Sequence, residues 1–188
     1  MKSLLVKPMK KYISIVILSL IGLYTFAQAP QVLFYGYIEE GKFDDPNSTK
    51  KRKKEKAPEK LKGVKIFVYK GDSLSKTVEA RETGFYALLL DAGVNYRVTF
   101  EKDNYFCKSF ELDCTEAKYP SNEGAIKCLT DVSLFKKIDN DDLLSLCKTP
   151  FAKCKFVNGD MIWDMEYTER AREKFYELAQ PYYMAADK

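Results

Sequence analysis

Residues 61–72, with the sequence LKGVKIFVYKGD, decide the fold of this chain. Every second residue from Val64 to Val68 is branched and apolar, and larger or charged residues lie between them. An alternation with a period of two is typical of a strand that buries one face. Gly71 and Asp72 then supply a turn, so we expect the chain to fold back after this strand.

The same alternation recurs on both sides of this stretch. Further strands are predicted at 32–38, 74–80, 85–90, 96–100, 105–113 and 126–135. Turn residues separate several of these strands, and no strand alternates with a helix, which argues against a doubly wound α/β fold. We therefore predict a mostly β fold, a seven-stranded antiparallel sandwich over residues 28–135, with a long exposed loop at 39–62.

Residues 136–188 are predicted to form a C-terminal extension. It begins with a short helix through Leu143, which Asp141 or Asp142 could cap. A strand at 151–157, a two-residue hairpin turn at 158–159 and a return strand at 161–163 follow. Apolar residues then recur at helical spacing opposite charged ones, which predicts an amphipathic helix that Pro181 ends.

Four motifs occur in a characteristic order along the predicted sandwich. They are Gly36, the run LKGVKIFV at 61–68, the run GFY at 84–86 and the run YRVTFEKDNY at 96–105. In this order they resemble the carboxypeptidase regulatory-like domain, a transthyretin-like (prealbumin-like) β-sandwich that is common in envelope proteins of Gram-negative bacteria. The resemblance implies an accessory domain and no peptidase activity.

The motif residues have physical roles of their own. Gly63 and Gly84 precede strands, where a turn needs a positive φ. Asn104 stands where the family has glycine, and asparagine tolerates the same backbone conformation. Tyr86 and Tyr96 are expected to bury their rings and to keep the hydroxyl group at a strand end. The chain departs from the family at 81–83, where Arg-Glu-Thr replaces the usual Thr-Asp.

The first 27 residues have the order of a secretory signal peptide. Basic residues come first, at Lys2, Lys7, Lys10 and Lys11. An apolar run at 12–26 and small residues follow. Cleavage after Ala27 leaves Gln28 first and is preferred to cleavage after Ala29. The alternative is an uncleaved anchor, although the run is shorter than a membrane span. The first cysteine is Cys107, too far from the signal for a lipoprotein.

Removal of this segment leaves a neutral protein. The chain has 31 basic and 27 acidic residues, and four of the basic ones lie in the segment, so 27 remain against 27. A neutral exported protein has no general attraction for nucleic acid. The expected partners are therefore a protein of the envelope, an acidic membrane surface or a glycan, and the expected location is the periplasm or outer membrane.

The composition excludes several kinds of chemistry. The chain has no histidine, which removes Ser-His-Asp and Cys-His catalysis and His-ligated zinc. The acidic cluster Asp139, Asp141 and Asp142 lacks the glycine and the final glutamate of an EF-hand loop. Cysteine pairs at zinc-ligand spacing are also missing. We predict no catalytic residue, no metal and no cofactor.

The chain has five cysteines, an odd number for an exported protein. Cys107 and Cys114 fall on opposite faces of one predicted strand, too far apart for a disulfide. Cys147 and Cys154 could close a loop around Pro150. Because Cys154 shares a face with apolar neighbours, we favour reduced, buried cysteines that act as small hydrophobic residues.

Two groups of residues are candidates for partner binding. The first is the basic run Lys50, Lys51, Arg52, Lys53 and Lys54, which could contact lipid phosphates or an acidic protein. The second is the aromatic set Trp163, Tyr167, Tyr182 and Tyr183, which could form a sugar platform or a protein interface. The alternatives are a solvated loop and packing of the helix onto the sandwich.

Together these features predict a non-enzymatic exported interaction or structural module of the bacterial cell envelope, an accessory component of a periplasmic or outer-membrane assembly. The first alternative is a carbohydrate- or peptidoglycan-binding module, which needs an exposed row of aromatic residues. The second is a Cys- or carboxylate-based enzyme, which needs a pocket with perturbed acids or a thiolate.

Overall fold

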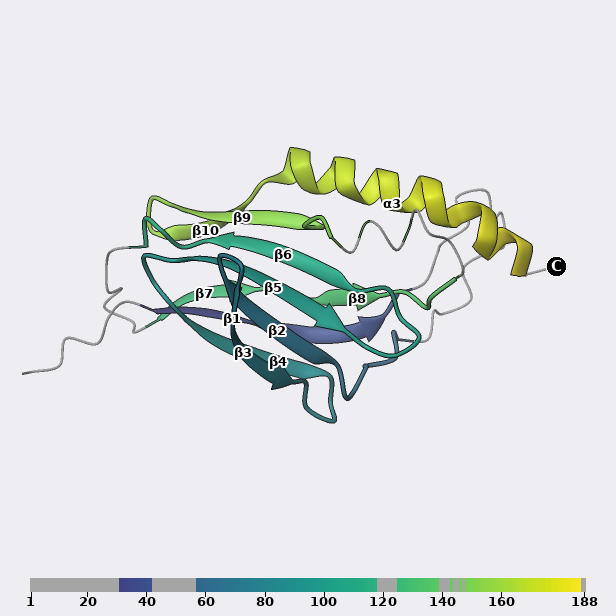
Figure 1. The fold of residues 1–188 in the computed structure, drawn as a ribbon, viewed down its shortest axis with the longest axis horizontal. Coiled ribbons are helices and arrows are strands. Elements are labelled where there is room, and N and C mark those ends of the chain that lie inside the picture. Colours follow the sequence, from purple (N-terminus) through teal and green to yellow (C-terminus); the bar gives the residue numbers. More distant parts are fainter. Residues whose placement is uncertain are drawn as a thin grey trace, which may run out of the picture.

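The computed structural model describes residues 31–41, 57–117, 125–138, 143, 146 and 148–186, with side chains up to residue 181. Within these residues the chain forms ten strands in two sheets and one long helix (Figure 1). The elements are β1 (Gln31–Glu40), β2 (Lys65–Lys70), β3 (Ser73–Glu79), β4 (Phe85–Asp91), β5 (Asn95–Glu101), β6 (Lys108–Asp113), β7 (Ala125–Leu129), β8 (Val132–Leu134), β9 (Ala152–Val157), β10 (Asp160–Trp163) and α3 (Met165–Ala186). The mostly β architecture is confirmed.

The two sheets pack face to face around the core. One has the order β4-β1-β7, with β8 also paired to β1, and the other has the order β10-β9-β6-β5-β2-β3. Strand β1 runs antiparallel to β4 but parallel to β7 and β8, and β6 runs parallel to β9. The prediction of purely antiparallel pairing is therefore wrong. Long stretches of chain separate these partners, and only such long connections allow parallel pairing.

The strand predicted at 126–135 is divided into β7 and β8 at Thr130 and Asp131, where its regular pairing with β1 is interrupted. Thr130 donates its backbone N–H to Tyr35 O at 2.8 Å, and Tyr37 donates its own to Asp131 Oδ1 at 2.8 Å. A Cβ atom on Gly36 would lie only 2.0 Å from Thr130 O. Glycine at this position therefore lets the connection pass against β1.

The core between the sheets confirms the expected roles of two tyrosines. Tyr86 and Tyr96 are both 2% exposed. The Tyr86 hydroxyl donates to Thr130 O at 2.7 Å, and the Tyr96 hydroxyl accepts the Asp91 N–H at 3.0 Å. Each ring is buried while its polar end is satisfied at the end of a strand, as an amphipathic aromatic side chain requires.

The predicted turn conformations are also confirmed. Gly63, Gly84 and Asn104 have φ angles of +66°, +73° and +65°. Asn158 and Gly159, with φ angles of +52° and +101°, form the hairpin turn between β9 and β10. This hairpin lies at the edge of the six-stranded sheet, because β9 pairs with β6.

Helix α3 runs alongside β9 (Figure 1). It begins where Asp164 Oδ1 accepts the Tyr167 N–H at 3.0 Å, which is an N-cap contact. The prediction that Pro181 ends this helix is wrong, because the helix continues to Ala186. Proline removes one hydrogen bond to the preceding turn and crowds the carbonyl of Glu177, yet the residues on both sides keep the helical conformation.

Several predictions fall on residues outside the described part of the chain. These are the signal segment at 1–27, the basic residues at 50–54, the acidic cluster at 139–142 and the side chains of Tyr182 and Tyr183. Leu143 and Leu146 are helical, as expected. None of the helices in the described residues is both long enough and apolar enough to span a membrane.

Candidate functional site

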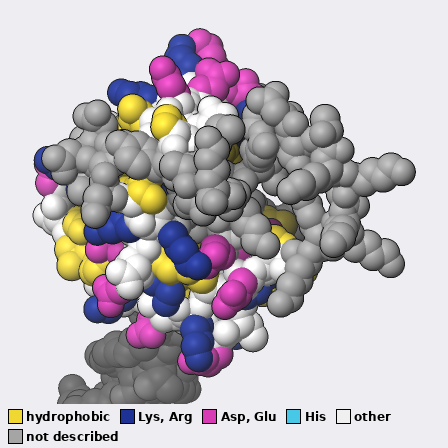
Figure 2. All heavy atoms as spheres, turned by 90° about the vertical axis from the view of Figure 1, so that its right-hand side faces the viewer, with side chains coloured by type: hydrophobic (Ala, Val, Ile, Leu, Met, Phe, Trp, Pro, Cys, Tyr) yellow, Lys and Arg dark blue, Asp and Glu magenta, His cyan; other side chains and the backbone are white. Residues whose placement is uncertain are grey.

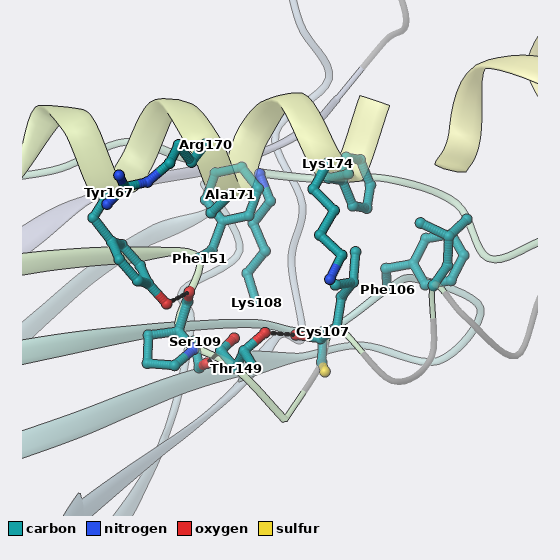
Figure 3. Close-up of a pocket in the computed structure, with 14 residues that line it drawn as sticks. Phe106, Cys107, Lys108, Ser109, Thr149, Phe151, Tyr167, Arg170, Ala171 and Lys174 are labelled. Carbon is teal, nitrogen blue, oxygen red and sulfur yellow. Dashed lines mark hydrogen bonds between the residues drawn. The ribbon is translucent and has the colours of Figure 1, made fainter. Parts of the chain in front are cut away.

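The candidate site is a cavity of about 370 Å³ between α3, the start of β6 and the residues before β9 (Figure 3). Its described walls are mainly apolar and aromatic, with basic side chains from β6 and α3. They consist of Phe106, Cys107, Lys108, Ser109, Leu143, Leu146, Thr149, Pro150, Phe151, Tyr167, Arg170, Ala171, Lys174 and Phe175. A cavity of this size lies at the lower end of the range for sites that bind small organic molecules.

Lys108 is the first residue of β6 and is buried, with 9% of its surface exposed. It is the only buried lysine in the described part of the cavity wall. Its Nζ lies 4.0 Å from the ring centroid of Phe151 and 5.0 Å from that of Phe135. Among the described residues it has no hydrogen-bond acceptor. Burial lowers the pKa of Lys108 to about 7, because removal from water disfavours the charged amine.

The rings around Lys108 belong to a second hydrophobic core beneath α3. Phe175 of the helix packs at 5.1 Å from Phe135, 6.0 Å from Phe106 and 6.1 Å from Phe151, measured between ring centroids. Cation–π contacts of this kind contribute about 2 kcal/mol when they are desolvated. The aromatic contacts therefore offset part of the cost of burying the amine.

Sequence reasoning missed Lys108, although a signal for it was present. Phe106, Phe110 and Leu112 are apolar and alternate with residues of the other face. Lys108 shares their parity, so it interrupts the apolar face of the strand. A charged residue at a core-facing position of a strand is an indication of either a structural pair or a functional group.

Basic side chains at the rim differ in how they are held. The guanidinium of Arg170 is paired with Glu166 on the same helix at 2.7 Å. The side chain of Lys174 extends from α3 towards Cys107 and into the cavity (Figure 3). The described lining includes no acidic residue. All the charged side chains in the described cavity wall are therefore basic.

The predicted aromatic candidates are held by internal contacts. The ring of Trp163 packs edge to face on Phe110, with centroids 5.9 Å apart. The Tyr167 hydroxyl donates to Pro150 O at 2.8 Å and closes one end of the cavity. These contacts agree with the alternative in which the extension packs onto the sandwich. A role of these residues in partner binding stays a prediction.

Three of the cysteines confirm the prediction of reduced, buried thiols: Cys114, Cys128 and Cys154 are free and lie in the main core. Burial raises the pKa of Cys114 to about 12, so this thiol stays protonated. Cys107 instead forms a disulfide. The described residues contain no cluster of metal-ligating side chains.

A second feature is the outer face of the four-stranded sheet, which we call the apolar face. It consists of Leu33, Tyr35, Tyr37, Phe85, Ala87, Leu89 and Leu129, and it also carries the exposed Lys127, which pairs with Leu33. These residues adjoin one another across the strands, since Leu33 pairs with Leu89 and Tyr35 with both Ala87 and Leu129. Tyr37, Leu89 and Leu129 are 42%, 46% and 62% exposed.

Charged side chains are distributed differently elsewhere. Figure 2 shows basic and acidic side chains interspersed over the described part of one end of the molecule. No patch of a single sign dominates the described atoms in this view. The apolar face is therefore the more distinctive of these surfaces.

Two comparisons with known proteins found no match for this chain. No protein-family model matches it, and no curated protein matches it. The resemblance to the carboxypeptidase regulatory-like domain accordingly stays a prediction.

Proposed function

We propose that the protein is a non-enzymatic exported interaction module of the bacterial cell envelope, an accessory component of a periplasmic or outer-membrane assembly. The observation that carries this proposal is the apolar face of the four-stranded sheet. Large contiguous apolar patches are rare on monomeric soluble proteins and mark interaction sites.

The composition of the apolar face favours a protein partner. Tyr35, Tyr37 and Phe85 supply aromatic rings, and aromatic residues are enriched at the centre of protein interfaces. The rings of Tyr37 and Phe85 already pack edge to face, with centroids 5.5 Å apart. This packing holds both side chains in fixed positions before a partner arrives, which reduces the entropy lost on binding.

Export is supported by the order of residues 1–27, and the prealbumin-like relationship is supported by the two-sheet architecture. The positive φ angles at Gly63, Gly84 and Asn104 agree with the turns that the resemblance implies. The parallel pairing of β1 with β7 departs from a purely antiparallel sandwich. We retain the relationship as part of the proposal on the strength of the turns and the order of the motifs.

Site-specific photo-crosslinking in intact cells tests the interaction. A photoreactive amino acid at Leu89 is expected to crosslink to one envelope protein. The matched control is Lys65, which is exposed on the outer face of the opposite sheet. Equal crosslinking from both positions would contradict an interface on the apolar face, and an intact Met1 on the cell's own protein would contradict export with processing.

A further inference from the structure

The cavity beneath α3 carries charge of one sign. Its described lining contains the basic residues Lys108, Arg170 and Lys174 and no acidic residue. Arg170 is already paired with Glu166 on the exposed side of the helix. Neither Lys108 nor Lys174 has an ion-pair partner among the described residues. Both lysines therefore offer a positive charge to the cavity, Lys108 among the aromatic rings and Lys174 beside Cys107 (Figure 3).

Lys108 is the group that most needs such a partner. A buried amine without a hydrogen-bond acceptor is costly, and a carboxylate supplies both an acceptor and a compensating charge. Charge-assisted hydrogen bonds of this kind are about twice as strong as neutral ones. The aromatic contacts of Lys108 with Phe135 and Phe151 fix where its amine lies.

The remaining walls define the other end of the ligand. Rings of Phe106, Phe151 and Phe175 line the cavity together with Leu143 and Leu146. This surface has little to offer a sugar or a polyanion, because it presents few hydrogen-bonding groups. The hydroxyls of Ser109 and Tyr167 are also engaged, since they donate to Thr149 O and Pro150 O.

We propose that this cavity binds a small monocarboxylate with an aromatic or branched apolar body. The carboxylate interacts with the amines of Lys108 and Lys174, and the apolar body packs against Phe151 and Phe175. This ligand site lies beside the six-stranded sheet and is separate from the apolar face. It does not depend on the proposed interaction with an envelope protein.

Titration calorimetry on the processed protein isolated from cells tests the proposal with phenylacetate as the probe. Phenylacetate is expected to bind at least about tenfold more tightly than 2-phenylethanol, which has a similar body but no charge. The cation 2-phenylethylamine is expected not to bind. Equal affinities for phenylacetate and the alcohol, or no binding of phenylacetate at millimolar concentration, would overturn the proposal.

Variants separate the lysines of the cavity from lysines in general. Lys108→Met and Lys174→Met are each expected to weaken phenylacetate binding about tenfold or more. Lys155→Met is the matched control, because Lys155 is exposed on β9 outside the cavity, and its affinity is expected to equal that of the wild type. Wild-type affinity in Lys108→Met would contradict the assignment.

A measurement on the unmodified protein guards against misfolded variants. Addition of phenylacetate is expected to shift the backbone amide NMR signals of Ser109, Phe151 and Ala171, which line the cavity. The signal of Leu89 on the opposite sheet is expected to stay unchanged. Shifts at Leu89 without shifts at the cavity residues would place the ligand elsewhere and overturn the proposal.

Discussion

Replacing Lys108 with methionine is expected to stabilise the protein at neutral and lower pH. In the folded protein, burial lowers the pKa of Lys108 to about 7 from the ordinary lysine value of 10.5. The unfolded chain therefore binds more protons than the folded chain between these two pH values. Stability rises with pH wherever the unfolded state binds more protons, so this lysine makes the wild type gain stability from pH 7 to pH 10.5.

The magnitude follows from the same pKa difference. Each pH unit inside this window changes the free energy of unfolding by up to about 1.4 kcal/mol, which sums to about 5 kcal/mol as an upper bound. The cation–π contacts return about 2 kcal/mol of this cost. We expect Lys108→Met to gain between about 2 and 5 kcal/mol at pH 6. The gain should shrink towards pH 10.5.

Urea denaturation of wild type, Lys108→Met and Lys155→Met at several pH values measures this effect. The charged groups that line the same two cavities as Lys108 are Arg170 and Lys174 of α3 and Asp131 before β8. These groups are present in both proteins. The difference in unfolding free energy between wild type and Lys108→Met therefore reports on Lys108 alone. A pH-independent difference, or a Lys108→Met variant that is less stable than wild type at pH 6, would refute the reasoning.

Three further predictions address other parts of the chain. Gly36→Ala should lower the free energy of unfolding by about 2 kcal/mol or more, because its Cβ would lie 2.0 Å from Thr130 O, and equal denaturation midpoints would contradict this. Alkylation under denaturing, non-reducing conditions should label Cys114, Cys128 and Cys154 but not Cys107, as peptide mass spectrometry can show, and a labelled Cys107 would disprove its disulfide. Changing residues 50–54 together to Ser or Gln should weaken binding to outer-membrane vesicles, measured by co-sedimentation. The binding free energy should fall by up to about 1 kcal/mol per lost charge at low salt, and by less at high salt. Equal, salt-independent binding of the two proteins would show that these residues are only a solvated loop.

Local patterns predicted the local structure of this protein well. Alternation at 64–68 and at 32–38 marked β2 and β1, and Gly63, Gly84 and Asn104 marked turns with positive φ. Such features depend on a few adjacent residues, which a sequence displays directly. The hairpin turn at 158–159 was predictable for the same reason.

Features that depend on distant parts of the chain were not predictable. The parallel pairing of β1 with β7 joins segments that are far apart in sequence, and alternation is the same for parallel and antiparallel neighbours. The cavity around Lys108 forms only where α3, β6 and the turn before β9 meet. The sequence shows only that Lys108 interrupts the apolar face of its strand. Pro181 is a local signal for the end of a helix, but the helix continues past it to Ala186.

Analysis of the complex in gently solubilised envelopes, by native separation and mass spectrometry, tests the central claim most directly. The proposal predicts that wild-type protein migrates with a second kind of polypeptide. It also predicts that Leu89→Lys, which places a charge on the apolar face, releases the protein as a monomer while its melting temperature stays unchanged. Migration of the wild type as a free monomer, or an unchanged complex in Leu89→Lys, would contradict the proposed interaction role.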